Sequence, residues 1–123
     1  MSQTVTVTRD GAIAVVTIDN PPVNALGFNL RAPLMDALNA IAADPSVEGV
    51  VIACAGRTFV AGADITEFGK PLKSPELRDL IAVLETIDRP TVAAIHGTAL
   101  GGGLELALGC HFRVAVASAR LRD

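Results

Sequence analysis

Two short, almost wholly apolar runs constrain the fold more than any other feature of this sequence. They are GVVIACA at residues 49–55 and TVAAIHG at residues 91–97. A run of this length and composition is typical of a strand that is covered on both faces. A segment of helical periodicity precedes each run, so we expect strands joined by crossover helices.

The first helical segment is recognised by its apolar spacing. Leu30, Leu34, Leu38 and Ile41 follow one another at intervals of four, four and three residues, which places them on one face of a helix. Proline is best tolerated in the first turn of a helix, so Pro33 predicts that the helix proper begins there, with the preceding residues as a bent lead-in.

The second helical segment has a clear start signal. Ser74 supplies a capping hydroxyl, Pro75 fits the first helical position and Glu76 places an acid in the first turn. Arg89 and Pro90 predict its end. Its apolar face is expected to carry Leu77, Leu80, Ile81, Leu84 and Ile87.

The remaining segments complete an alternating pattern. Residues 4–9 alternate polar and apolar, Asp10-Gly11 is typical of a tight hairpin turn, and residues 12–19 form the returning strand. A turn and a short helix follow residue 97, and residues 111–118 form the last expected strand. The order β-β-α-β-α-β-α-β predicts one α/β domain.

Composition narrows the function classes. The chain has 123 residues, a net charge of −3, no Trp or Tyr and four Phe, so the core is aliphatic. No cluster of Lys and Arg favours a nucleic acid or a membrane surface as partner, and the broken apolar stretches favour no transmembrane span. The N-terminal residues lack a signal-peptide pattern, so we expect a cytoplasmic protein. Cys54 and Cys110 are expected as buried free thiols, and no metal site is expected.

Two loops centred on glycine each follow a buried strand, where α/β proteins place their ligand loops. The first is FVAGADI at residues 59–65, in which Gly62 permits a positive φ or a close backbone approach. The second is LGGGLE at residues 100–105, whose glycines would begin a helix with free backbone amides. Such amides attract negative charge, including an oxyanion that develops during a reaction.

Glu105 lies three residues after Gly102, so the two share a helix face about one turn apart. A carbonyl oxygen held by the Gly102 amide would therefore have a carboxylate nearby to move a proton. Two other interpretations stay open on the residues alone. The glycines can be a tight strand-to-helix turn with Glu105 as a dipole partner, and a dinucleotide site is possible although GTALGGG does not fit G-x-G-x-x-G.

The two loops together resemble the crotonase (enoyl-CoA hydratase/isomerase) superfamily. The matching segments are IAVVTIDNPPVNALG, GRTFVAGADITEF and RPTVAAIHGTALGGGLELALGCHFRVA. The segments NPPVNALG and LGCHFRVAVASARL are most similar in sequence to the hydratase half of multifunctional enzymes that also carry a 3-hydroxyacyl-CoA dehydrogenase. The resemblance implies a crotonase-like ββα spiral that binds an acyl-CoA thioester as substrate, needs no further cofactor and assembles as a homo-oligomer, a trimer or hexamer in full-length members.

The resemblance also implies roles for individual residues. The backbone amides of Ala63 and Gly102 would form an oxyanion hole, and Glu105 would be one of two family glutamates that handle water addition and α-proton transfer. Substrate would be bound along both loops and along the VNALG segment. The implied binding residues are Ala25 and Leu26 near the adenine, Asp64, Ile65 and Thr66 along the pantetheine, and Ala61, Gly62, Ala63, Gly101 and Gly102 around the thioester.

The sequence departs from the family pattern in the segment that carries the second glutamate. The segment with FGxPE or GLPE, which carries the second glutamate, does not follow ARL here. Residues 1–123 are therefore expected to be the N-terminal part of a crotonase-like domain, truncated after about half of the module. The expected parent reaction is hydration of trans-2-enoyl-CoA in fatty-acid β-oxidation. The alternatives are a non-catalytic fragment with a partial CoA site and a related reaction such as enoyl-CoA isomerisation.

Overall fold

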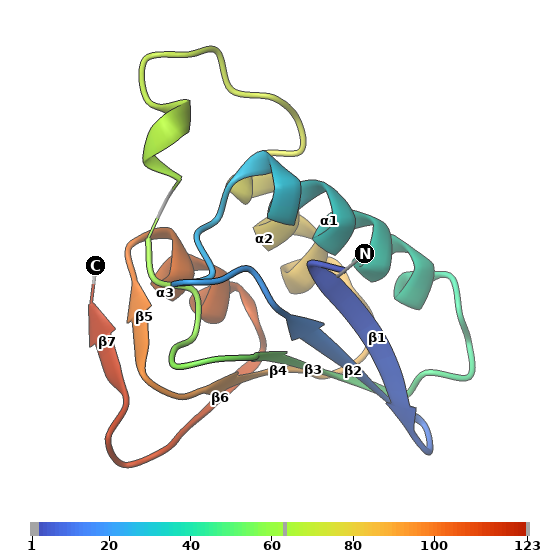
Figure 1. The fold of residues 1–123 in the computed structure, drawn as a ribbon. Helices are drawn as coiled ribbons and strands as arrows, with labels where there is room; N and C mark the ends of the chain where they lie inside the picture. Colours follow the sequence, from blue (N-terminus) through green and yellow to red (C-terminus); the bar gives the residue numbers. More distant parts are fainter. Residues whose placement is uncertain (1–2, 63, 123) are drawn as a thin grey trace.

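A five-stranded sheet forms the floor of the molecule (Figure 1). The computed structural model describes residues 3–62 and 64–122. Strands β1 and β2 pair as an antiparallel hairpin around Gly11, which confirms the predicted hairpin, and the other three strands add in parallel. The sheet order is β1 (Val5–Asp10), β2 (Ile13–Ile18), β3 (Gly49–Cys54), β4 (Thr91–Ile95) and β6 (Phe112–Ala115). The predicted α/β class is therefore confirmed.

Three helices lie on one side of this sheet: α1 (Phe28–Ala42), α2 (Leu77–Thr86) and α3 (Gly102–Gly109) (Figure 1). The core is the layer between them, and it is aliphatic as composition predicted, with Phe59 as its one large aromatic among the described residues. The expectation that residues 49–55 are covered on both faces is wrong. Val51 and Ala53 remain partly exposed because the helices cover only one face.

The start of α1 differs from the prediction. The helix begins at Phe28 and includes Pro33, although proline was expected to open it. The physical reason is tertiary. The Glu67 carboxylate accepts a hydrogen bond of 2.7 Å from the Phe28 backbone N–H, and Leu30 is fully buried, so the turn before the proline is held in helical form.

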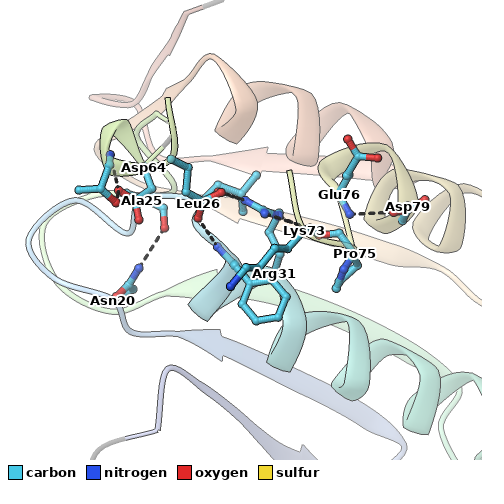
Figure 2. A network of polar contacts seen from close by, with 12 residues as sticks. Asn20, Ala25, Leu26, Arg31, Asp64, Lys73, Pro75, Glu76 and Asp79 are labelled. Atoms are coloured by element: carbon cyan, nitrogen blue, oxygen red, sulfur yellow. Dashed lines mark hydrogen bonds and ion pairs between the residues drawn. The ribbon is translucent and has the colours of Figure 1, made fainter. Parts of the chain in front are cut away.

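The start of α2 also differs. Ser74 and Pro75 lie before the helix, which begins at Leu77. The Asp79 carboxylate reaches back to accept a hydrogen bond of 2.7 Å from the Glu76 backbone N–H, so the cap is formed by an acid inside the helix and not by the serine hydroxyl (Figure 2).

The sequence did not predict a second, two-stranded sheet. Strands β5 (Thr98–Leu100) and β7 (Arg120–Arg122) pair in parallel. The sequence pattern had indicated a turn after residue 97 and no strand after residue 118. The last predicted strand, 111–118, is shorter in the structure because Ala119 N–H bonds to Val116 and the chain turns there.

Candidate active site

Strand β5 brings the two glycine loops together. Its last residue, Leu100, donates its backbone N–H to Val60 (3.2 Å) and accepts the N–H of Gly62 (3.0 Å). Gly103 packs so tightly on the same segment that a Cβ there would overlap the Val60 carbonyl. The pairing therefore places residues 60–62 directly beside the entry to α3.

The entry to α3 presents free amides and one carboxylate. Gly101 caps the helix with a positive φ of 56°, and the Glu105 N–H is the first to bond back, to the Gly101 carbonyl at 3.0 Å. The Gly101 N–H donates to the Arg122 carbonyl (2.8 Å), whereas the amides of Gly102 and Gly103 have no backbone acceptor among residues 3–62 and 64–122. Gly102 and Glu105 both line a pocket of about 320 Å³, as their spacing predicted. The other lining residues are Leu26, Arg31, Leu72, Glu76, Leu77, Arg78 and Ile81.

Two carboxylates face this pocket, and their surroundings differ. Glu76 forms an ion pair with Arg78 at 2.9 Å. The Glu105 carboxylate is exposed and has no hydrogen-bond or ion-pair partner within residues 3–62 and 64–122. Glu105 is therefore the carboxylate of this pocket that has no partner in the described part of the chain.

The loop after Gly62 is tied to the segment that precedes α1. Leu26 N–H donates to the Gly62 carbonyl (3.1 Å), and Ala61 N–H donates to the Val23 carbonyl (3.0 Å). Ala63, the expected second oxyanion donor, lies outside the described residues. Ile65 begins a short 3-10 helix (Ile65–Glu67), and its side chain also lies outside the described part of the chain.

Asp64 shapes its own loop. Its Oδ1 accepts hydrogen bonds from the Thr66 hydroxyl and from the Thr66 backbone N–H (2.9 Å for the latter). These two bonds, the side-chain one first, hold the pKa of Asp64 below its usual value. The carboxylate acts as a loop-capping acid in this structure.

The predicted binding residues are not all in one cavity. Leu26 shares the pocket with Gly102 and Glu105, whereas Thr66 lines a neighbouring pocket of about 460 Å³ that also includes Phe28 and Lys70. Five others are not in the lining of either pocket and belong to the backbone around them: Ala25, Ala61, Gly62, Asp64 and Gly101.

Sequence reasoning missed two buried polar residues that hold the site. Asn24 is 2% exposed and bonds to the backbone of Asn20, Ala55 and Thr58. Arg31 is 5% exposed and bonds to several loops (Figure 2). The sequence did contain a signal for Arg31. It lies on the same helix face as Leu34 and Leu38, and a charge buried there without a partner would be energetically costly, so its position indicates that it has polar partners.

Other chemistries have no support among the described residues. They contain no group of three or more His, Cys, Asp or Glu side chains that could hold a metal ion. None of the helices in the described ranges has the length and apolarity to cross a membrane. Cys54 and Cys110 are free and buried, as predicted, and burial raises their pKa to about 12 and about 11.

Comparison with known proteins is consistent with this geometry. The sequence model of one family, described as Enoyl-CoA hydratase/isomerase, matches residues 8–122. The chain is 46% identical over 110 residues to a peroxisomal bifunctional enzyme of Danio rerio, covering 89% of this chain and 15% of that protein. It is 44% identical over 120 residues to a protein of Bacillus subtilis named "Probable enoyl-CoA hydratase", covering 91% of this chain and 46% of that protein.

Similarity extends to solved structures. An enoyl-CoA hydratase/carnithine racemase from Magnetospirillum magneticum superimposes with a TM-score of 0.87 at 33% identity, covering 98% of this chain and 49% of that one. The chain thus spans about half the length of this structure and of the Bacillus relative, and a smaller share of the bifunctional enzyme.

Proposed function

The chain belongs to the enoyl-CoA hydratase/isomerase family, and we propose that it binds an acyl-CoA thioester between its two glycine loops and takes part in hydration of trans-2-enoyl-CoA. Its fold is the crotonase-like α/β fold that the resemblance implied. The single observation that carries the proposal is the pocket in which the free carboxylate of Glu105 lies one helical turn from Gly102, at a helix N-terminus.

In the proposed reaction, the thioester carbonyl oxygen accepts hydrogen bonds from the backbone amides of Gly102 and Ala63. Water adds across the C2=C3 double bond, so the oxygen bonds to C3 and a proton is placed on C2. Negative charge collects on the thioester oxygen during this step, and one oxyanion donor typically contributes about 3 kcal/mol to lowering the barrier. Glu105 accepts or delivers one of the two protons.

The rest of the substrate would follow the loops. We propose that Ala25 lies near the adenine, and Asp64, Ile65 and Thr66 along the pantetheine channel. Leu26 was expected near the adenine but lines the pocket beside Gly102 and Glu105, so we propose that it contacts the acyl end of the substrate instead. Ala61, Gly62 and Gly101 contribute backbone beside the thioester. The thioester is the substrate itself, and the proposed chemistry draws on no further cofactor.

Hydration is tested with crotonyl-CoA by following the loss of absorbance of the enoyl thioester. We expect Glu105→Gln to lower the rate by about a hundredfold or more, because general acid–base catalysis contributes that much. Glu85→Gln, which changes an exposed acid on α2, is the matched control and should keep the parent rate. Equal rates for the parent and Glu105→Gln, both well above the uncatalysed rate, would remove Glu105 from the mechanism.

Isomerisation is a second candidate, and one observation favours it. The described part of the pocket holds one carboxylate without a partner, and one base suffices to carry a proton from C2 to C4 of a 3-enoyl-CoA. Conversion of 3-enoyl-CoA to the conjugated 2-enoyl thioester raises absorbance in the same assay. A rise with 3-enoyl-CoA and no loss with crotonyl-CoA would select the isomerase.

A third outcome is binding without turnover. We propose that residues 1–123 correspond to the N-terminal part of a crotonase-like domain, in keeping with the half-length match to the Bacillus relative. Binding of an acyl-CoA in a calorimetric titration, in the absence of turnover, would identify residues 1–123 as a binding unit. No heat of binding with any acyl-CoA would contradict the proposed function altogether.

We further propose that the chain self-associates and acts in the cytoplasm. Three apolar side chains at and after β6 support association, because Phe112, Val114 and Val116 are 53–63% exposed. Sedimentation velocity should show an oligomer that Phe112→Glu dissociates. Val7→Glu, at the opposite edge of the sheet, is the control and should leave the assembly intact.

A further inference from the structure

Arg31 joins loops that are distant in sequence. Its Nη1 donates to the Leu26 carbonyl (2.9 Å) and to Glu67 Oε1 (3.1 Å). Its Nε donates to the Pro75 carbonyl (2.8 Å), and Nη2 donates to the Lys73 carbonyl (3.3 Å) (Figure 2). One buried guanidinium thus binds the segment before α1, the loop after position 63 and the loop before α2.

These loops are walls of the pocket that contains Glu105. Leu26 lines it on one side, and Leu72, Glu76 and Leu77 line it from the segment around Lys73 and Pro75. Arg31 itself is part of the lining. The cation is therefore located where a change in its bonds alters the shape of the pocket.

Arg31 also contacts the loop on which the oxyanion hole is proposed. Glu67, its ion-pair partner, accepts the Phe28 backbone N–H through Oε2. On the other side of position 63, Gly62 is held by the Leu26 N–H. The residues on both sides of position 63 are consequently bonded to residues 26–31. Arg31 bonds to Glu67, on the C-terminal side.

Only an arginine can make this set of contacts. The guanidinium is a rigid planar fork with five N–H donors, whereas a lysine offers one compact ammonium group on a flexible stem. A carbonyl that loses its donor in this buried position is left unsatisfied or turns toward water, which moves its loop.

We propose that Arg31 is a positioning residue for acyl-CoA binding, which sets the geometry of the oxyanion loop and of the pocket wall through its bonds to Leu26, Glu67, Lys73 and Pro75. This inference rests on the proposed function. The chain supplies a matched control in Arg89, which pairs with Asp88 and donates to the carbonyls of Ile41, Ala42 and Asp44 at the opposite end of α1. Arg89 has the same chemistry and no contact with the pocket.

The test compares Arg31→Lys with Arg89→Lys by calorimetry, using acetoacetyl-CoA and free CoA as probes. The first probe carries an enolate-forming thioester that needs the oxyanion loop, and the second has no thioester. We expect Arg31→Lys to weaken acetoacetyl-CoA binding about tenfold, as loss of one charge-assisted hydrogen bond does, and free CoA about twofold or less. Arg89→Lys should change neither dissociation constant, although both variants lose stability.

Hydrogen exchange without ligand gives an independent readout. Arg31→Lys, and to a smaller extent Glu67→Gln, should speed exchange at the Phe28 and Thr66 amides, and Arg89→Lys should not. Parent affinity for acetoacetyl-CoA in a folded Arg31→Lys protein, or equal weakening of both probes, would overturn the positioning role. Failure of the parent chain to bind either probe would instead contradict the proposed function. The exchange rates of the Phe28 and Thr66 amides would then still decide whether Arg31 orders the segments that contain these two residues.

Discussion

Gly103 packs against Val60 so closely that any side chain at position 103 would meet the Val60 carbonyl oxygen and carbon. This contact joins the first turn of α3 to the segment that leads into the other glycine loop. The third glycine of the GGG run is thus required for approach between two backbones, while the first is required for its positive φ.

Gly103→Ala should therefore be strongly destabilising. The atoms that would have to move are backbone atoms of a buried segment, so we expect a loss of at least about 2 kcal/mol in the free energy of unfolding. Urea unfolding measures it. Gly102→Ala is the comparison, because a Cβ there lies 3.3 Å from the flexible end of Leu77 and should cost less. Similar losses in both variants would contradict this explanation.

Asn24 should be needed for stability as well as for loop shape. Its Oδ1 accepts the Asn20 N–H at 2.7 Å, and its Nδ2 donates to the carbonyls of Ala55 and Thr58. Asn24→Ala leaves these buried groups without partners, so we expect a loss of about 1–3 kcal/mol in thermal or urea unfolding. Asn29→Ala changes an exposed asparagine nearby and should stay within about 0.5 kcal/mol of the parent.

The buried thiols predict how stability depends on alkaline pH. Burial raises the pKa of Cys54 from 9.0 to about 12 and that of Cys110 to about 11. The unfolded chain releases these protons near pH 9 while the folded chain keeps them. The free energy of unfolding should thus be unaffected by the thiols below pH 8 and should fall above pH 9, approaching ~1.4 kcal/mol per pH unit for each thiol.

Urea unfolding at pH 8, 9 and 10 measures this slope. The chain has no tyrosine, so phenol ionisation does not contribute over this range. The double variant Cys54→Ala, Cys110→Ala is the control and should be less stable at pH 8 but lose most of the alkaline slope. A parent slope equal to that of the double variant would show that the thiols ionise alike in both states.

Leu77 should limit the length of the acyl chain that the proposed site accepts. Its side chain lies over Gly102 in the pocket. Leu77→Ala opens space for about two more methylene groups at ~0.8 kcal/mol each, so octanoyl-CoA should gain about tenfold in affinity over butyryl-CoA relative to the parent. Calorimetry of both ligands tests this. Leu108→Ala, an exposed position on α3, should leave the ratio unchanged, and an unchanged ratio in Leu77→Ala would place the acyl chain elsewhere.

Local sequence was sufficient wherever the determining interactions are close in the chain. The β1–β2 hairpin follows from alternation and the Asp10-Gly11 turn, and α3 begins at the glycine run because its cap requires a positive φ. The spacing of Gly102 and Glu105 placed both in one pocket, since a helix fixes which residues share a face. The resemblance of the two loops to a family implied the acyl-CoA chemistry that we propose, which the residues alone left open.

Tertiary structure decided what depends on contacts between distant segments. Helix α1 begins at Phe28 because Glu67, 39 residues later, accepts its N–H, and local rules placed the start at Pro33 instead. Strand β7 exists because β5 is available to pair with it, and neither has a strong pattern of its own. The position of Arg31 on the apolar face of α1 indicates burial, but its partners are decided only when the loops around Glu67, Lys73 and Pro75 pack against it. Sequence therefore determined the hairpin, the approximate positions of the helices and the shared pocket of Gly102 and Glu105, whereas the packing of loops far apart in the chain determined the shape of that pocket.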